Sequence, residues 1–221
     1  TEGSSDGTGI EQETVTIVDE DALPTVSLST GSPSIDEEAG TTTNPMTPVI
    51  ATLSAISQKE ITVTLAKTGT AEEGSTKDYT LSSTIIVPIE SISASVTLAA
   101  VSDLFDEAVI ETIIIDITGV VNGTEDGVQR QTVNLIDDDT ANITLTVEAD
   151  VVNEDFGLTT TNVKASTDLF ASQVITVTLQ KTGTAIDGTD YTLVGTIEIP
   201  PFTSSASVAF ASVVDTLDEF D

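Results

Sequence analysis

The sequence predicts an all-β chain built from tandem immunoglobulin-like β-sandwiches, each with seven antiparallel strands. Short segments in which apolar and polar residues alternate follow one another along the 221 residues, as in strands with one buried face. No segment shows a sustained helical period. The sequence also repeats itself with a period of about 118 residues, which indicates stacked modules.

Four segments of one repeat recur in the next. The matched residues are 61–65 with 175–179, 67–71 with 181–185, 78–81 with 190–193, and 93–96 with 205–208. An acidic stretch closes a repeat twice, at 19–21 and at 137–139. We therefore expect residues 1–23 to be the C-terminal strand of a preceding repeat, 24–139 a complete repeat, and 140–221 the N-terminal two-thirds of a following one. The chain would then be a segment of a longer array.

Seven alternating segments make up the complete repeat, at residues 25–29, 48–56, 61–67, 84–88, 94–98, 112–118 and 131–136. Thr and Ser fill most outward positions, and Val, Ile and Leu fill the inward ones. Turn signals such as Asn122-Gly123 separate the segments. We expect six apolar side chains to point into the sandwich: Val63, Leu65, Val96, Leu98, Ile115 and Leu135. The cysteine pair and tryptophan of antibody domains are absent, so only the architecture is implied.

The composition narrows the classes of function. Acidic residues outnumber basic ones 37 to 6, which argues against nucleic acid and anionic membranes as partners. No apolar run approaches the roughly 18 residues that a membrane span needs, so we expect no direct membrane insertion. The chain has no cysteine and no histidine, which removes thiolate ligands, disulfides and the commonest general base. Carboxylate oxygens remain as the abundant ligand type.

The carboxylates fall into two groups. Scattered ones, such as Glu60, Glu90 and Glu125, are expected on the solvated surface. A second group recurs between repeats and lies at strand ends and in loops. Five or more converging carboxylates repel one another unless a cation neutralises them, because two like charges about 4 Å apart cost about 4 kcal/mol at an effective dielectric near 20. Ca²⁺ suits oxygen ligands drawn from several loops. The alternative is that these acids only form a solubilising, charged end of each module.

The order of the recurring acids resembles the Calx-β domain. The pattern is Glu-x-x-Gly at Glu37, Gly-x-x-x-Asp-Tyr ending at Asp78-Tyr79, an acidic loop from Asp103 to Glu107, and a terminal Asp-Asp-Asp. In that family these positions meet at one end of the sandwich and bind Ca²⁺. The family's second loop glutamate usually follows the first by three residues, whereas Glu111 follows Glu107 by four.

The resemblance implies Ca²⁺ ligands at three places. In the complete repeat they are Glu37, Asp78, Asp103, Glu107, Glu111, Asp137, Asp138 and Asp139. In the following repeat they are Glu154, Asp190, Asp215 and Glu219, and the preceding repeat contributes Asp19 and Asp21.

The expected function is that of a calcium-stiffened stalk. Calx-β arrays of this Thr-, Ser- and Val-rich composition resemble the stalks of giant bacterial adhesins, including those of gliding bacteria. We therefore expect an extracellular, cell-surface protein that mediates adhesion or gliding motility, with neighbouring repeats of the same chain and an unidentified surface or cell ligand as partners. The alternative is a Ca²⁺-sensing regulatory module, as in sodium–calcium exchangers. An acid pair such as Asp103 and Glu107 could serve a glycosidase, but aromatic residues make up only 4% of the chain, so we expect no enzyme.

Overall fold

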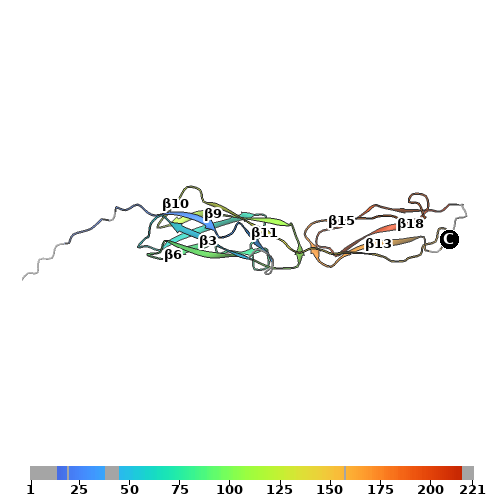
Figure 1. Ribbon diagram of the computed structural model, residues 1–221, viewed down its shortest axis with the longest axis horizontal. Helices are drawn as coiled ribbons and strands as arrows, with labels where there is room; N and C mark the ends of the chain where they lie inside the picture. The colour runs from blue at the N-terminus through green and yellow to red at the C-terminus, as the bar shows by residue number, and fades with distance from the viewer. Residues whose placement is uncertain (1–13, 19, 38–44, 157, 216–221) are drawn as a thin grey trace, which may run out of the picture.

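The computed structural model describes residues 14–18, 20–37, 45–156 and 158–215. These residues form two β-sandwich units arranged end to end along one axis (Figure 1). No described residue is helical, and so no helix in this part of the chain has the length and apolar character of a membrane span. The predicted all-β class is confirmed.

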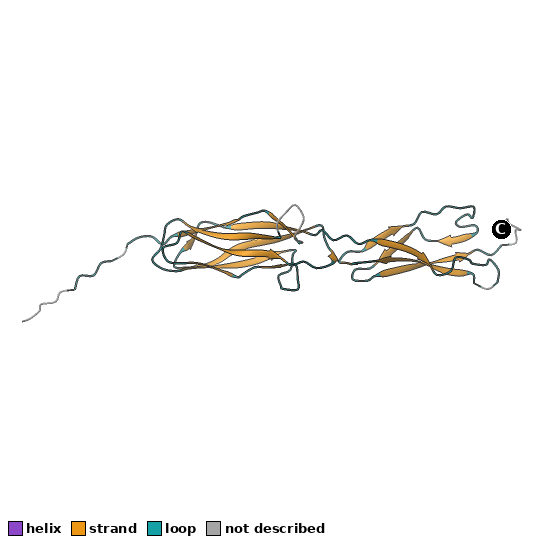
Figure 2. Cartoon of the chain, turned by 60° about the horizontal axis from the view of Figure 1, so that its bottom comes forward, coloured by secondary structure: helices purple, strands orange, loops and turns teal. Residues whose placement is uncertain are grey.

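Two five-stranded sheets face each other in the first unit (Figure 2). One sheet has the order β10 (Thr124–Glu125), β1 (Thr25–Thr30), β3 (Met46–Leu53), β7 (Ser93–Ala100) and β5 (Tyr79–Thr80). The other has the order β2 (Ser34–Asp36), β11 (Arg130–Ile136), β9 (Ile110–Val121), β4 (Ile61–Gly69) and β6 (Thr84–Val87).

The seven predicted strands correspond to β1, β3, β4, β6, β7, β9 and β11, and the pairs they form with one another are antiparallel. Three shorter strands, β2, β5 and β10, extend the sheets at their edges. Two of them pair in parallel, β10 with β1 and β2 with β11, so the sheets are not purely antiparallel as predicted. Strands of two or three residues are too short to produce an alternating pattern, which is why the sequence did not indicate them.

The core of the first unit lies between the two sheets. Val63, Ile115 and Leu98 are fully buried, and Leu65 and Leu135 are 5% and 3% exposed. Val96 is partly buried and packs against the same cluster. The period of two therefore places the predicted side chains on the inner faces, where burial of each is worth about 1.5–3 kcal/mol.

The second unit has two smaller sheets around its own core. One has the order β12 (Ile143–Val147), β13 (Thr160–Thr167), β18 (Ser205–Ser212) and β16 (Tyr191–Leu193), and the other pairs β15 (Ile175–Thr178) with β17 (Thr196–Ile199). Val163, Ala165, Ile197 and Ile199 form its buried cluster. The ring of Tyr191 stacks on Phe210 with centroids 4.8 Å apart.

The two units also meet through a short parallel pair of strands. In this pair β8 (Phe105–Asp106) of the first unit lies beside β14 (Phe170–Ala171) of the second, and the Ser172 amide donates to the Asp106 carbonyl oxygen at 2.9 Å. The Phe105 ring lies 6.1 Å from the Phe170 ring and 6.2 Å from the Phe202 ring, centroid to centroid. The units are thus joined by backbone pairing and aromatic contact as well as by the chain itself.

In the segment expected to be a strand of a preceding repeat, none of the residues that the structure describes lies in a strand. Residues 14–18 are described and lie outside every sheet, and Val15 and Ile17 are 85% and 91% exposed. A sheet that would pair with them is not part of the described chain, so this expectation stays a prediction.

Neighbouring residues of β4 point to opposite faces of the sheet, which allows a direct test of which side chains form the core. Leu65→Ala should lower the free energy of unfolding by about 2–5 kcal/mol, because it leaves a cavity between the sheets. Thr64→Ala, one residue away on the solvent side, should change it by less than about 0.5 kcal/mol. Urea unfolding followed by fluorescence or circular dichroism measures both, and similar losses for the two variants would mean that the strand phase is wrong.

Candidate cation site

Carboxylates from separate segments meet at the end of the first unit that faces the second. Glu37 follows β2, Asp78 precedes β5, Asp103 and Glu107 flank β8, and Glu111 lies in β9. Asp137 and Asp139 follow β11. Successive antiparallel strands bring alternate loops to the same end of a sandwich, so acids far apart in the sequence become neighbours.

The loop that carries Asp78 is held by its own hydrogen bonds. The Asp78 carboxylate accepts a hydrogen bond from the Glu72 amide at 2.5 Å, and the Asp78 amide donates to the Glu72 carbonyl oxygen at 3.1 Å. The loop starts at Gly69, whose φ is 131° and where a Cβ would lie 2.0 Å from the Thr112 carbonyl oxygen, so only glycine fits. Lys67 contacts Glu73 and donates to the Leu81 carbonyl oxygen at 2.9 Å. Asp78 is therefore presented by a fixed loop.

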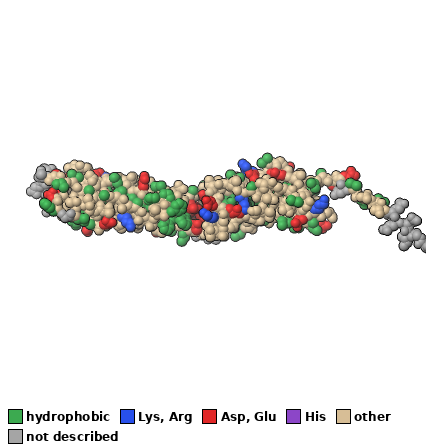
Figure 3. All heavy atoms as spheres, turned by 180° about the vertical axis from the view of Figure 1, so that it is seen from behind, with side chains coloured by type: hydrophobic (Ala, Val, Ile, Leu, Met, Phe, Trp, Pro, Cys, Tyr) green, Lys and Arg blue, Asp and Glu red, His purple; other side chains and the backbone are tan. Residues whose placement is uncertain are grey.

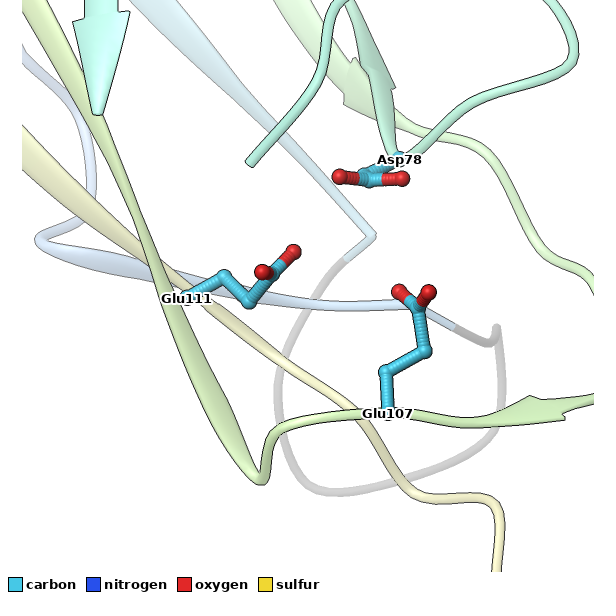
Figure 4. A group of neighbouring side chains, drawn as sticks. All are labelled: Asp78, Glu107 and Glu111. Atoms are coloured by element: carbon cyan, nitrogen blue, oxygen red, sulfur yellow. The ribbon is translucent and has the colours of Figure 1, made fainter. Parts of the chain in front are cut away.

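Asp78, Glu107 and Glu111 form the tightest group. Each offers a carboxylate oxygen, and these oxygens lie within 4.8 Å of one another. Figure 4 shows the three carboxylates turned toward a common space. A single divalent cation in that space would contact all three, and without one their charges oppose each other.

Glu37 is buried beside this group. Its side chain is 4% exposed, and Oε1 has no hydrogen-bond partner among the residues that the structure describes. The pKa of Glu37 is raised to about 8, mainly by burial and then by the negative charges of four nearby acids, Asp103, Asp137, Glu107 and Asp139. A buried carboxylate oxygen that lacks a donor is costly unless it is protonated or coordinated to a cation.

Electrostatic interactions link Glu37 with the tight group of Asp78, Glu107 and Glu111. Burial raises the pKa of Glu111 to about 7, with a hydrogen bond to Asp78 and the charges of Asp78 and Glu107 as further causes. The pKa of Glu107 is raised by burial and then by Asp78, Asp103 and Asp137. Asp137 also has a raised pKa through burial, although its carboxylate accepts from the Glu107 amide at 2.7 Å and the Asp139 amide at 3.1 Å. The acids form one continuous band with Glu107 in the middle.

Four acids of the band line a cavity of about 360 Å³ between the two units: Asp78, Asp103, Glu107 and Glu111. The first unit lines it with acids and with one basic side chain, Lys77, and the second unit contributes Ser172, Gln173 and Phe202. Figure 3 shows acidic side chains gathered near the middle of the elongated molecule, with basic side chains among them. The cavity is polar, partly closed, and large enough for hydrated cations.

The predicted ligands differ in where the structure places them. Glu37, Asp78, Asp103, Glu107, Glu111, Asp137 and Asp139 come together, whereas Asp138 is exposed beside Asp137. In the second unit the Asp215 amide donates to the Glu154 carboxylate at 3.0 Å, and the Val213 amide donates to the Asp190 carbonyl oxygen at 2.9 Å. Asp21 lines a different cavity, with residues 55–59 of the loop between β3 and β4. Asp19 and Glu219 lie outside the described residues.

Three residues at the site were not among the predicted Ca²⁺ ligands. Glu72 and Lys77 line the cavity, and the Asp106 carboxylate accepts from the Ala141 amide at 3.0 Å across the junction. Comparison of the repeats does not identify Glu72 or Lys77, because neither recurs. Ile186 stands at the position of Glu72, and the second repeat has no basic residue in place of Lys77. The sequence offered one signal for each residue: Glu72 stands next to Glu73, and Lys77 stands next to the predicted ligand Asp78.

No protein-family model matches the sequence, and no curated protein is detectably similar to it. Among solved structures, CBD12 from CALX1.2 is similar with 14% identity and a TM-score of 0.43, over 85% of this chain and 74% of that one. The calcium binding domain CBD12 of CALX1.1 has 18% identity and a TM-score of 0.40, over 82% and 73%. A two-domain protein of unknown function from Bacteroides fragilis NCTC 9343 has 9% identity and a TM-score of 0.38, over 71% and 68%. These likenesses concern the overall arrangement of strands, and no binding property is carried over from them.

The raised pKa values predict how stability depends on pH in the presence of a chelator. Since the pKa of Glu37 in the folded chain, about 8, exceeds its ordinary 4.5, the folded state holds this proton more tightly than the unfolded state does. Its contribution to stability is therefore complete below pH 4.5 and is lost as pH rises toward 8. Glu37→Gln removes the titrating group, so its melting temperature minus that of the wild type should increase over this range. Thermal melts in chelator at several pH values measure this difference.

Glu60→Gln, which replaces an exposed acid outside the cavity, is the matched control and should show no such trend. A Glu37→Gln difference that stays constant with pH would mean that Glu37 is not held in a destabilising environment.

Proposed function

We propose that this chain is a Ca²⁺-binding segment of a tandem-repeat stalk, and that Ca²⁺ binds the carboxylate band at the junction of the two units. The observation that carries the proposal is Glu37, a buried carboxylate with one oxygen that has no hydrogen-bond partner among the described residues and with four acids acting on it. An acidic surface alone would leave its carboxylates in water. This site instead buries the carboxyl group of Glu37, whose negative charge a bound cation would stabilise.

The chemistry of the donors favours Ca²⁺ over other metals. All of the candidate ligands are carboxylates, and the sequence has no histidine or cysteine that would favour zinc or copper. The acids come from separate segments and face an irregular space, which suits the six to eight oxygens and flexible geometry of Ca²⁺ better than the strict octahedron of Mg²⁺. Bound Ca²⁺ would supply positive charge and bridge the segments, while Glu37, Asp78 and Glu107 would hold it.

The position of the band supports a role in stiffening the chain. Glu107 immediately follows β8, the strand that pairs with β14 of the second unit. Its amide donates to the carboxylate of Asp137, which directly follows the last strand of the first unit, and the Asp106 carboxylate accepts from the Ala141 amide in the connection. A cation that fixes Glu107 would thus also fix the strand and the connection through which the second unit is held.

The stalk would belong to a large extracellular adhesin that mediates cell-surface adhesion or gliding motility. The support is the acidic composition without cysteine, the internal repetition, and the end-to-end arrangement of the units. Antibodies raised against this chain should label intact, unpermeabilised cells of the source organism. Labelling only after permeabilisation would overturn the extracellular assignment.

Ca²⁺ binding is tested by isothermal titration of the metal-free chain with Ca²⁺ and, separately, with Mg²⁺. Ca²⁺ should bind more tightly, and it should stabilise the fold by about 2.7 kcal/mol when free Ca²⁺ is 100 times its dissociation constant. Glu37→Gln should weaken binding by about tenfold or more, which is about 1.4 kcal/mol. Glu60→Gln should bind like the wild type. If the wild-type chain neither binds Ca²⁺ nor melts at a higher temperature with it, the proposal is wrong.

Whether Ca²⁺ stiffens the joint between the two units is tested by removing the aromatic contact across it. Phe105→Ala removes the ring that touches Phe170 and Phe202, so Ca²⁺ should still bind but should no longer fix the angle between the units. Small-angle scattering of the wild type should show a narrower distribution of dimensions with Ca²⁺ than with chelator, and Phe105→Ala should show similar distributions in both. Phe156→Ala, which removes a ring that is 85% exposed, serves as the control. A wild-type profile unaffected by chelation would exclude stiffening.

A further inference from the structure

One basic side chain lies within the carboxylate band. The Lys77 ammonium is 2.6 Å from a carboxylate oxygen of Glu72, and Lys77 lines the junction cavity together with Asp78, Glu107 and Glu111. The negative charges of Asp78 and Glu107 also act on it. No other lysine or arginine lines this cavity in the described part of the chain.

The Lys77 side chain is largely solvated at this position. It is 54% exposed and that of Glu72 is 65% exposed, so their ion pair is held in water and not fixed by packing. Its neighbour Asp78 is held by the Glu72 amide, which keeps the base of Lys77 next to the tight group. A long, solvated ammonium tethered there can approach the same oxygens that a divalent cation would contact.

The two repeats differ at this point. In both, a lysine at a matched position contacts an acid six residues later, Lys67 with Glu73 and Lys181 with Asp187. Both loops then place an aspartate whose carboxylate accepts from a backbone amide, at 2.5 Å for Asp78 and 2.6 Å for Asp190. Between the matched glycine and aspartate the loop of the first repeat is two residues longer, and only this loop carries a basic side chain there, Lys77. The insertion therefore adds a positive charge to a loop that is otherwise built in the same way.

We infer that Lys77 is a tethered counter-ion that competes with the divalent cation for the carboxylate band. This inference rests on the proposed Ca²⁺ site and adds a regulation to it. When Ca²⁺ is scarce, the ammonium partly offsets the repulsion among Asp78, Glu107 and Glu111, and so limits the loss of stability. When Ca²⁺ binds, the ammonium is displaced into the solvent, which lowers the net affinity. The first repeat is thereby set to bind Ca²⁺ more weakly than its carboxylates alone would.

The decisive variant is Lys77→Gln, which keeps a polar side chain of similar length and removes the charge. Ca²⁺ affinity measured by isothermal titration should increase by about two- to fivefold, the factor that corresponds to the coupling of an exposed ion pair. In chelator the same variant should melt at a lower temperature than the wild type. A gain of affinity together with a loss of metal-free stability is not an effect that simple misfolding produces.

Three comparisons separate charge competition from other effects. Lys77→Arg keeps the charge and should bind Ca²⁺ like the wild type. Lys59→Gln removes a charge from the loop between β3 and β4, which lines a different cavity, and should leave the affinity unchanged. The gain from Lys77→Gln should shrink as salt is raised from 0.05 to about 0.5 M, because screening weakens the competition.

The outcomes also separate this inference from the proposed function. If the wild type binds Ca²⁺ and Lys77→Gln binds it equally or more weakly, the counter-ion inference is wrong while the Ca²⁺ site stands. If Lys59→Gln gains as much as Lys77→Gln, the effect is one of net charge and the inference is again wrong. If neither the wild type nor Lys77→Gln binds Ca²⁺, the proposed function itself fails.

Discussion

The structure at the junction depends on one constraint, the mutual repulsion of carboxylates that the fold forces together. Glu37 is buried, and Asp78, Glu107 and Glu111 converge within 4.8 Å, although each would be more stable alone in water. The apolar core makes this arrangement possible, because the burial of side chains such as Val63 and Ile115 between the sheets fixes where the strands end. The hydrophobic effect thus holds in place a set of charges that would otherwise separate.

The pattern that predicts the core is different in kind from the pattern that predicts the site. Alternation along β4 and β9 is local, so Val63, Leu65 and Ile115 could be placed on the inner face from the sequence alone. The convergence of Glu37 with Asp103 and Asp137 is not local. It was predicted only because these acids recur at strand ends and follow the order of a resembling family. Glu37 is buried, and its Oε1 has no hydrogen-bond partner among the described residues. Both features depend on packing between loops, which no local pattern reports.

Repetition both revealed and concealed features of the site. It identified Asp78 and Asp190 as equivalent, and their loops indeed use the same backbone hydrogen bond. For the same reason it passed over Glu72, which is replaced by Ile186 in the second repeat, and Lys77, which has no basic equivalent there. The contact of Phe105 with Phe170 was also not predicted, since two single aromatic residues in separate repeats form no pattern until the units are placed against each other. Comparing the repeats with each other identifies residues that recur, so it cannot identify residues that occur in one repeat only.

The candidate ligands lie at the end of the first unit that joins the second. The segment from Asp103 to Glu107 contributes ligands on both sides of β8, and β8 itself pairs with the second unit. Any force that moves the second unit therefore acts on the candidate ligands, and anything that binds the ligands acts on the second unit. Such coupling must be reciprocal in free energy, so a cation that favours the docked arrangement is itself bound more tightly by it. In a chain of such units, the bending stiffness of each joint would then follow the concentration of the cation.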